Sequence, residues 1–304
     1  MPPTTAGEEH VFNYSHVAFK DYVAFMEDQP GADDPDTVRA WNDDWRRAHD
    51  HLEDLRIYEA AAADDVPIEP LPAEMAEMVE RVHGDPIYKR SFTAVPVEIG
   101  MVELDRLIVW QTLVSLEHTD RLTRQLQPEA DAETLFRFCL PYDHPMAEHR
   151  FAKTSDHSFV FTSRSTDLRF LDAVLLRPNQ LVNYPSYGPI AGVVALVVGY
   201  GSNYLNAIAA EGRLVLNNGN HRAYALRALG ITHAPCLIQK VDTREELAHV
   251  ATGGFRRHPD FYLTGPRPPL LKDYFDPLFH RKVIVPTTGR QIRVSFSTEE
   301  TDLP

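Results

Sequence analysis

Between residues 36 and 63, apolar side chains recur at steps of three or four residues or their multiples, with charged residues between them. The stripe consists of Val38, Trp41, Trp45, Leu52 and Leu55. This spacing predicts one long amphipathic helix, with Asp36 as its N-cap and both tryptophans packed in the core. A shorter helix is expected over 73–83, because Gly84 and Pro86 follow it.

After residue 90 the pattern changes to β-branched and apolar runs that are typical of strands. Strands are expected in the ranges 92–104, 158–176 (as two strands), 193–200, 213–216 and 234–241. Helices are expected over 220–229 and from 242 to about 254, and 283–296 is typical of a closing β-hairpin. The mixture predicts an α+β protein.

The charged residues are unevenly distributed along the 304 residues. Residues 1–88 contain 21 acidic and 6 basic side chains, whereas the remainder contains 23 and 24, so the net charge of −14 belongs to the N-terminal segment. We therefore expect an acidic helical region over 1–88, which offers a surface to a protein partner, and a second domain over 89–304. This charge balance disfavours DNA as a partner.

The composition narrows the class of protein further. No run of 18 apolar residues is present, so we expect no membrane-spanning segment. The two cysteines, Cys139 and Cys236, are too few for a disulfide framework, which favours a cytoplasmic protein.

The segment RLVLNNGNHRAYALRALG, residues 213–230, reads as a strand, a polar turn and a helix. The first turn of a helix has unpaired N–H groups and the positive end of the helix dipole, and a glycine lets the backbone approach a phosphate closely. The expected binding residues are Asn218, Gly219, Asn220, His221 and Arg222. The alternative is a plain Asn-Gly turn in which His221 and Arg222 are solvated.

The same segment resembles a known family. The strand Leu214-Val215-Leu216, the turn Gly219-Asn220-His221-Arg222, the following helix, Gly230-Ile231 and the strand from Pro235 are similar to the core of the ParB/sulfiredoxin-like fold. Residues 102–111 resemble the first conserved box of that family. The resemblance implies a mixed sheet with flanking helices, and a nucleotide such as ATP or CTP, with Mg²⁺, bound by its phosphates at the helix start.

Departures from the family pattern restrict the activity that the resemblance implies. Sulfiredoxins require a cysteine where this chain has Asn220, and partitioning proteins continue into a helix-turn-helix that this sequence lacks. Free-serine kinases have an acidic residue where Asn218 stands and a catalytic glutamate near the first box, for which Glu103, Asp105 and Glu117 are candidates.

These observations lead to three hypotheses for the function. The first is a nucleotide-dependent enzyme that transfers a phosphoryl group to, or activates, a small-molecule substrate, with Glu103 and His221 as catalytic residues. The second is a nucleotide-sensing or protein-interaction module without turnover. The third is a ParB-like nuclease or DNA-binding protein.

An insertion of about residues 125–190 interrupts the predicted domain. It contains several histidines and carboxylates over 141–159, and His144, His149 and His157 are candidate ligands of a divalent metal. The alternative is a polar loop with solvated histidines.

Overall fold

The computed structural model describes residues 7–126, 130–144, 146–165, 167–183, 188–287 and 289–302. The chain divides into two compact units, of which unit 1 comprises residues 1–143 and 203–286 and unit 2 comprises residues 144–202 and 287–304. Both helices and strands are abundant, so the predicted α+β class is confirmed. None of the helices in the described ranges is long and apolar enough to cross a membrane.

The main sheet of unit 1 has five strands in the order β10-β9-β11-β3-β2. Their bounds are β2 Ile68–Glu69, β3 Val97–Glu103, β9 Asn206–Ala210, β10 Arg213–Asn218 and β11 His233–Lys240. Neighbouring strands are antiparallel except β9 and β11, which are parallel. A second sheet of unit 1 has the order β12-β1-β4, with β1 Gly7–Asn13, β4 Leu113–Ser115 and β12 His280–Pro286.

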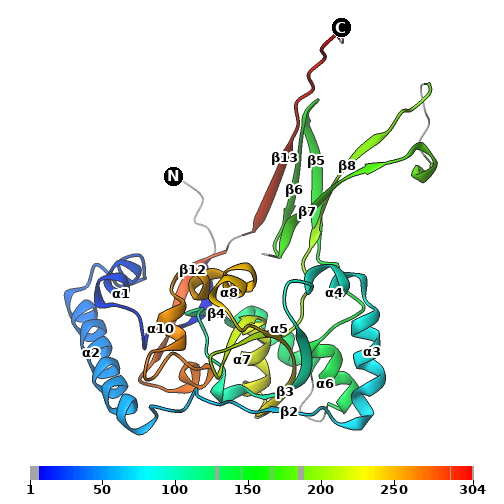
Figure 1. Cartoon of the computed structure of the whole chain (residues 1–304). Coiled ribbons are helices and arrows are strands. Elements are labelled where there is room, and N and C mark those ends of the chain that lie inside the picture. The colour runs from blue at the N-terminus through cyan, green and yellow to red at the C-terminus, as the bar shows by residue number, and fades with distance from the viewer. Residues whose placement is uncertain are drawn as a thin grey trace. The chain divides into compact units, whose positions relative to one another are not determined.

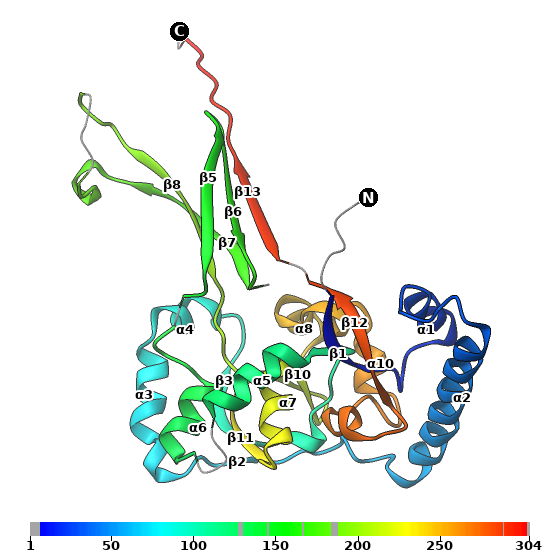
Figure 2. The same ribbon diagram turned by 180° about the vertical axis from the view of Figure 1, so that it is seen from behind.

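Ten α-helices surround these sheets in the described part of unit 1 (Figures 1 and 2). They are α1 Phe19–Met26, α2 Pro35–Tyr58, α3 Ala76–Gly84, α4 Pro86–Ser91, α5 Leu116–Gln125, α6 Ala132–Cys139, α7 Asn220–Ala228, α8 Arg244–Val250, α9 Gly253–Arg257 and α10 Pro259–Leu263. Short 3₁₀ turns are η1 Ala73–Met75, η2 Leu104–Arg106 and η4 Leu271–Phe275. The main core cluster combines apolar residues of the main sheet with those of α3, α6 and α7.

Helix α2 confirms the predicted long helix but differs in its details. Its N-cap is Asp34, whose carboxylate accepts a hydrogen bond from the Thr37 N–H at 3.1 Å, and not Asp36. Trp41 and Trp45 pack against the cluster that contains Tyr22 and Leu52, as predicted, but they are only half-buried and lie at its edge. The indole N–H of Trp45 donates to the carbonyl oxygen of Val17 at 2.9 Å, which keeps this ring at the edge of the cluster where a polar partner is available.

Unit 2 consists of strands in the described residues, with one 3₁₀ turn, η3 Pro178–Gln180. A three-stranded sheet has the order β13-β6-β5, with β5 His149–Ser155, β6 Ser158–Ser163 and β13 Arg290–Ser295. Strands β7 Leu168–Leu176 and β8 Val193–Tyr200 form an antiparallel two-stranded ribbon (Figure 1).

The predicted C-terminal hairpin is wrong. Strand β12 pairs with β1 in unit 1, and β13 pairs with β6 in unit 2, so the two segments belong to different sheets. Pairing with β1 buries Val283 in the cluster that contains Phe12 and Phe279. A local hairpin would leave that side chain without this apolar neighbourhood.

Candidate functional site

The predicted strand, turn and helix are present as β10, Gly219 and α7. Gly219 is the N-cap of α7 and has a φ of 97°, in the left-handed region that favours glycine. A Cβ at this position would lie 2.8 Å from Cδ1 and 3.2 Å from Cα of Leu205. The backbone conformation and the close approach of Leu205 therefore both require glycine here. Gly230, with a φ of 80°, follows the helix as predicted.

His221 lies in the first turn of α7 and is held by the start of another helix. Its Nε2 accepts a hydrogen bond from the Ser115 N–H at 3.1 Å, so the hydrogen of the neutral ring lies on Nδ1. Burial, and then the proximity of His118 and His10, lowers the pKa of His221 to about 3. Nδ1 donates to no acceptor among the described residues. His221 is therefore a neutral hydrogen-bond donor whose orientation is fixed.

Helix α5 begins beside α7. Its N-cap Ser115 accepts a hydrogen bond from the His118 N–H at 3.2 Å, and Thr119 Oγ1 donates to the Ser115 carbonyl oxygen. The rings of His118 and His221 meet edge to face with centroids 4.9 Å apart. Figures 1 and 2 both show α5 and α7 as neighbouring helices. The positive ends of two helix dipoles therefore lie side by side.

His118 is the second neutral imidazole of this site. Its pKa lies below the ordinary value because of burial, with smaller contributions from Arg121 and Arg222, whereas Glu8 acts in the opposite direction. The guanidinium of Arg121 lies 3.4 Å from Nδ1 and can only donate, which places the ring hydrogen on Nε2. The two histidines thus each present one N–H group at adjacent helix starts.

Strand β1 places the carboxylate of Glu8 beside Ser115, at the start of α5. Ser115 Oγ donates to Glu8 Oε2 at 3.4 Å, and His10 pairs in register with Ser115. A carboxylate beside a helix N-terminus is stabilised by the unpaired N–H groups. Sequence reasoning missed Glu8 and His10, because GEEHVFN is too polar to predict a strand and its partners β4 and β12 are distant in the chain.

Arg222 was predicted to grip a phosphate directly, but it is only 8% exposed. Its guanidinium donates to the carbonyl oxygen of Asn203 and lies 5.9 Å from the ring centroid of Phe138. The side chain therefore anchors the start of α7 to neighbouring segments. Its positive charge contributes to the local potential from beneath the surface.

Two predicted binding residues have mainly structural contacts. Asn220 is 5% exposed, and its Nδ2 donates to the Tyr274 hydroxyl at 3.0 Å. Its Oδ1 is buried and accepts no hydrogen bond from a described residue. Nδ2 of Asn218 donates to the Tyr204 carbonyl oxygen at 3.3 Å, which shapes the turn.

The structure does not bring Glu103 to the turn. Glu103 ends β3 and pairs with His233, after the C-terminal end of α7. At that end Arg227 binds Asp105 at 2.6 Å. Helix α7 has nine residues and is about 13 Å long, and Glu103 and Gly219 belong to opposite ends of it. The carboxylates nearer to His221 are Glu8 on β1 and Glu117, in the first turn of α5.

The candidate metal ligands do not converge. His149 starts β5 opposite Ser163, whereas His157 lies in the turn after β5, where its ring meets that of Phe296 edge-on. The two histidines are at opposite ends of a hairpin about 20 Å long. His144 precedes β5 with a φ of 39°. In the ranges that the structure describes, no group of three His, Cys, Asp or Glu residues is arranged to hold a metal ion.

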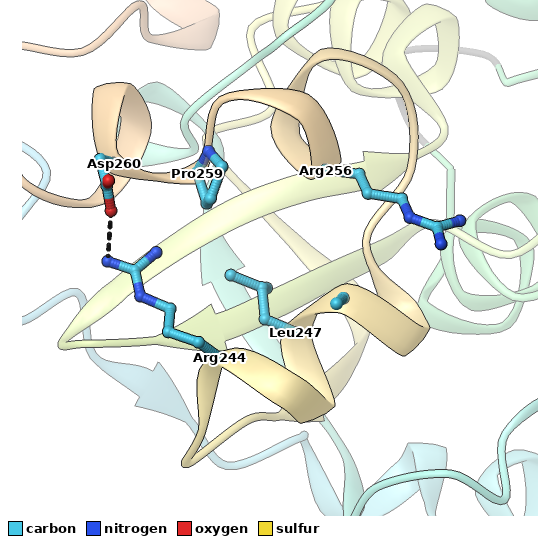
Figure 3. A pocket seen from close by; sticks show the side chains of 6 residues that line it. Arg244, Leu247, Arg256, Pro259 and Asp260 are labelled. Atoms are coloured by element: carbon cyan, nitrogen blue, oxygen red, sulfur yellow. Dashed lines mark ion pairs between the residues drawn. The ribbon is translucent and has the colours of Figure 1, made fainter.

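A cavity of about 230 Å³ lies between α8, α9 and α10, and none of its lining residues belongs to the turn (Figure 3). Arg244, Arg256 and Asp260 are among the residues that line it. Arg244 is neutralised there by Glu211 at 2.9 Å and by Asp260 at 2.8 Å, and Figure 3 shows the guanidinium of Arg256 pointing away from this pair. Its volume is below that of typical ligand pockets, so it is a weak candidate for a ligand site.

Comparison of the chain with models of protein families, with curated proteins and with solved structures finds no match.

Proposed function

We propose that unit 1 binds the phosphate group of a nucleotide at the paired starts of α5 and α7. The observation that carries this proposal is the pair of neutral imidazoles, His118 and His221, which lie at adjacent helix starts with ring centroids 4.9 Å apart and each carry one N–H donor. Two helix dipoles add to the attraction for an anion. Unit 1 carries the whole net charge of −14, so this attraction must be local.

The resemblance to the ParB/sulfiredoxin-like family supports a nucleotide as the source of the phosphate, with ATP or CTP and Mg²⁺ as the ligands to test. Binding is favoured over phosphoryl transfer, because the proposed base Glu103 lies at the far end of α7. His221 acts as a donor to the phosphate and not as a base, since its Nε2 is occupied by the Ser115 N–H. That the protein acts on a small-molecule substrate, and that its acidic N-terminal region binds a protein partner, are still predictions from the sequence.

Calorimetric titration of the full chain with Mg²⁺–ATP and Mg²⁺–CTP at low salt tests this proposal. His118→Ala removes one donor at the start of α5, and losing a hydrogen bond to a charged group costs about 1.5–3 kcal/mol, or about 10- to 150-fold in affinity. His249→Ala, at an exposed position of α8, is the matched control and should leave binding unchanged.

The carboxylate of Glu8 supplies a test in the opposite direction. A phosphate must compete with this carboxylate for the helix starts, so Glu8→Gln should tighten binding by about 1 kcal/mol, or about fivefold. Glu9, on the other face of β1, pairs with Lys282 at 3.0 Å, and Glu9→Gln should have no effect. Absence of binding to the wild type, or equal effects of the Glu8 and Glu9 variants, would refute the proposed site.

A further inference from the structure

The ribbon formed by β7 and β8 has two chemically different faces. Successive residues of a strand point to opposite sides, so the register assigns each residue to one face. One face consists of apolar and aromatic residues only, namely Leu168, Phe170, Ala173, Leu175, Val194, Leu196, Val198 and Tyr200. The other face contains both charged residues of the ribbon, Arg169 and Asp172.

The apolar face is exposed over much of its length. Leu175 and Val194 are directly opposite each other and are 76% and 69% exposed, and Phe170 is 46% exposed. Leu196 and Val198 are partly buried, and at the base Leu168 is buried and the Tyr200 hydroxyl donates to the carbonyl oxygen of Ala147. An isolated two-stranded ribbon is marginally stable in water, and a contiguous exposed apolar face is typical of an interaction site.

The distribution of charge favours unit 2 over unit 1 for a contact between two copies of the chain. Residues 144–202 and 287–304, which form unit 2, contain seven acidic and seven basic side chains and have no net charge. The whole net charge of −14 lies in unit 1. Two copies of unit 1 repel each other, whereas two copies of unit 2 do not. The uncharged face is also complementary to itself, because no like charges meet when it packs on an identical face.

We propose that this chain forms a homodimer in which the apolar face of the β7–β8 ribbon packs against the same face of a second copy. Such a contact is isologous, with each residue meeting its symmetry-related equivalents. The face is two strands wide and eight residues long, about 10 Å by 27 Å. This is less than half of the roughly 800 Å² per partner of a standard interface, so the dimer should dissociate in the micromolar range.

Sedimentation of the full chain over a range of micromolar concentrations tests the dimer. The wild type should shift from the mass of the 34.5 kDa chain to twice that mass as the concentration rises. Val194→Lys places a charge on the most exposed part of the apolar face and should hold the chain as a monomer at all these concentrations. Because Val194 is largely exposed, the variant should keep the wild-type circular dichroism spectrum and melting temperature.

Val197→Lys is the matched control. Val197 lies in the same strand but on the other face of the ribbon, where its cross-strand partner is Asp172, and it is 38% exposed. This variant should dimerise like the wild type. A wild type that stays monomeric, a Val194→Lys variant that still dimerises, or equal loss of dimer in both variants would overturn the proposal.

Discussion

Replacement of Gly219 by alanine should destabilise unit 1 for two separate reasons. The φ of 97° costs an L-residue about 1–2 kcal/mol, and the added Cβ would lie 2.8 Å from Cδ1 and 3.2 Å from Cα of Leu205. Overpacking of this kind costs about 1–3 kcal/mol, because Leu205 is fully buried and its backbone cannot retreat. The two effects together lower the free energy of unfolding by about 2–5 kcal/mol.

Gly230 is the matched control, because it shares the positive φ but not the contact. Its φ is 80°, and apart from its chain neighbours no atom of the described residues lies within 4 Å of an added Cβ. Gly230→Ala should therefore cost only about 1–2 kcal/mol. The difference between the two variants isolates the close approach of Leu205 to the turn.

Urea unfolding followed by tryptophan fluorescence measures both effects. The three tryptophans, Trp41, Trp45 and Trp110, all belong to unit 1, so the signal reports that unit. The midpoints should shift while the slopes stay equal, as expected when stability changes and the exposed area does not. Equal losses for Gly219→Ala and Gly230→Ala would show that Leu205 does not restrain the turn.

Two further predictions concern buried ionisable groups. Asp273 and Arg267 form a buried bidentate ion pair at 2.6 and 2.9 Å, so Asp273→Asn should lower the free energy of unfolding by about 3–5 kcal/mol in the same assay. Asp260→Asn, which removes an ion pair at the surface, should cost less than about 1 kcal/mol, and similar losses in the two variants would contradict the role of burial. Burial lowers the pKa of His221 to about 3 and of His16 to about 4, whereas an unfolded histidine titrates near 6.5. Because the unfolded chain then binds more protons, the contribution of each histidine to the free energy of unfolding is constant above about pH 6.5 and falls below it by up to about 1.4 kcal/mol per pH unit. His221→Gln should therefore reduce the slope of stability against pH between pH 6 and about pH 4. An unchanged slope would show that His221 titrates normally.

The turn and α7 could be predicted because their signals are local. Gly219 and Gly230 mark the two ends of the helix, and both adopt the positive φ that the sequence implies. The partners of the turn could not be predicted in the same way. His221 meets Ser115, and Arg222 meets Asn203, through contacts between segments that are far apart in the chain.

The strands at the two ends of the chain show the same limit. The hairpin expected over 283–296 rested on two neighbouring β-rich segments, but β12 pairs with β1 at the other end of the sequence. The other partner of β1 is β4, and this second pairing places Glu8 at the start of α5. A polar strand has no strong periodic signal, so its place becomes visible only once its partners are known.

The most direct test of the proposed site is long-range ¹H–¹⁵N spectroscopy of the histidine rings during titration of the full chain with Mg²⁺–ATP. At pH 7 the free protein should show a neutral His221 with its hydrogen on Nδ1 and a neutral His118 with its hydrogen on Nε2. Both ring N–H signals should shift as the nucleotide binds, while that of His249 should stay in place. Rings with the opposite tautomers, or signals of His118 and His221 that do not respond to the nucleotide, would contradict a phosphate site at the starts of α5 and α7.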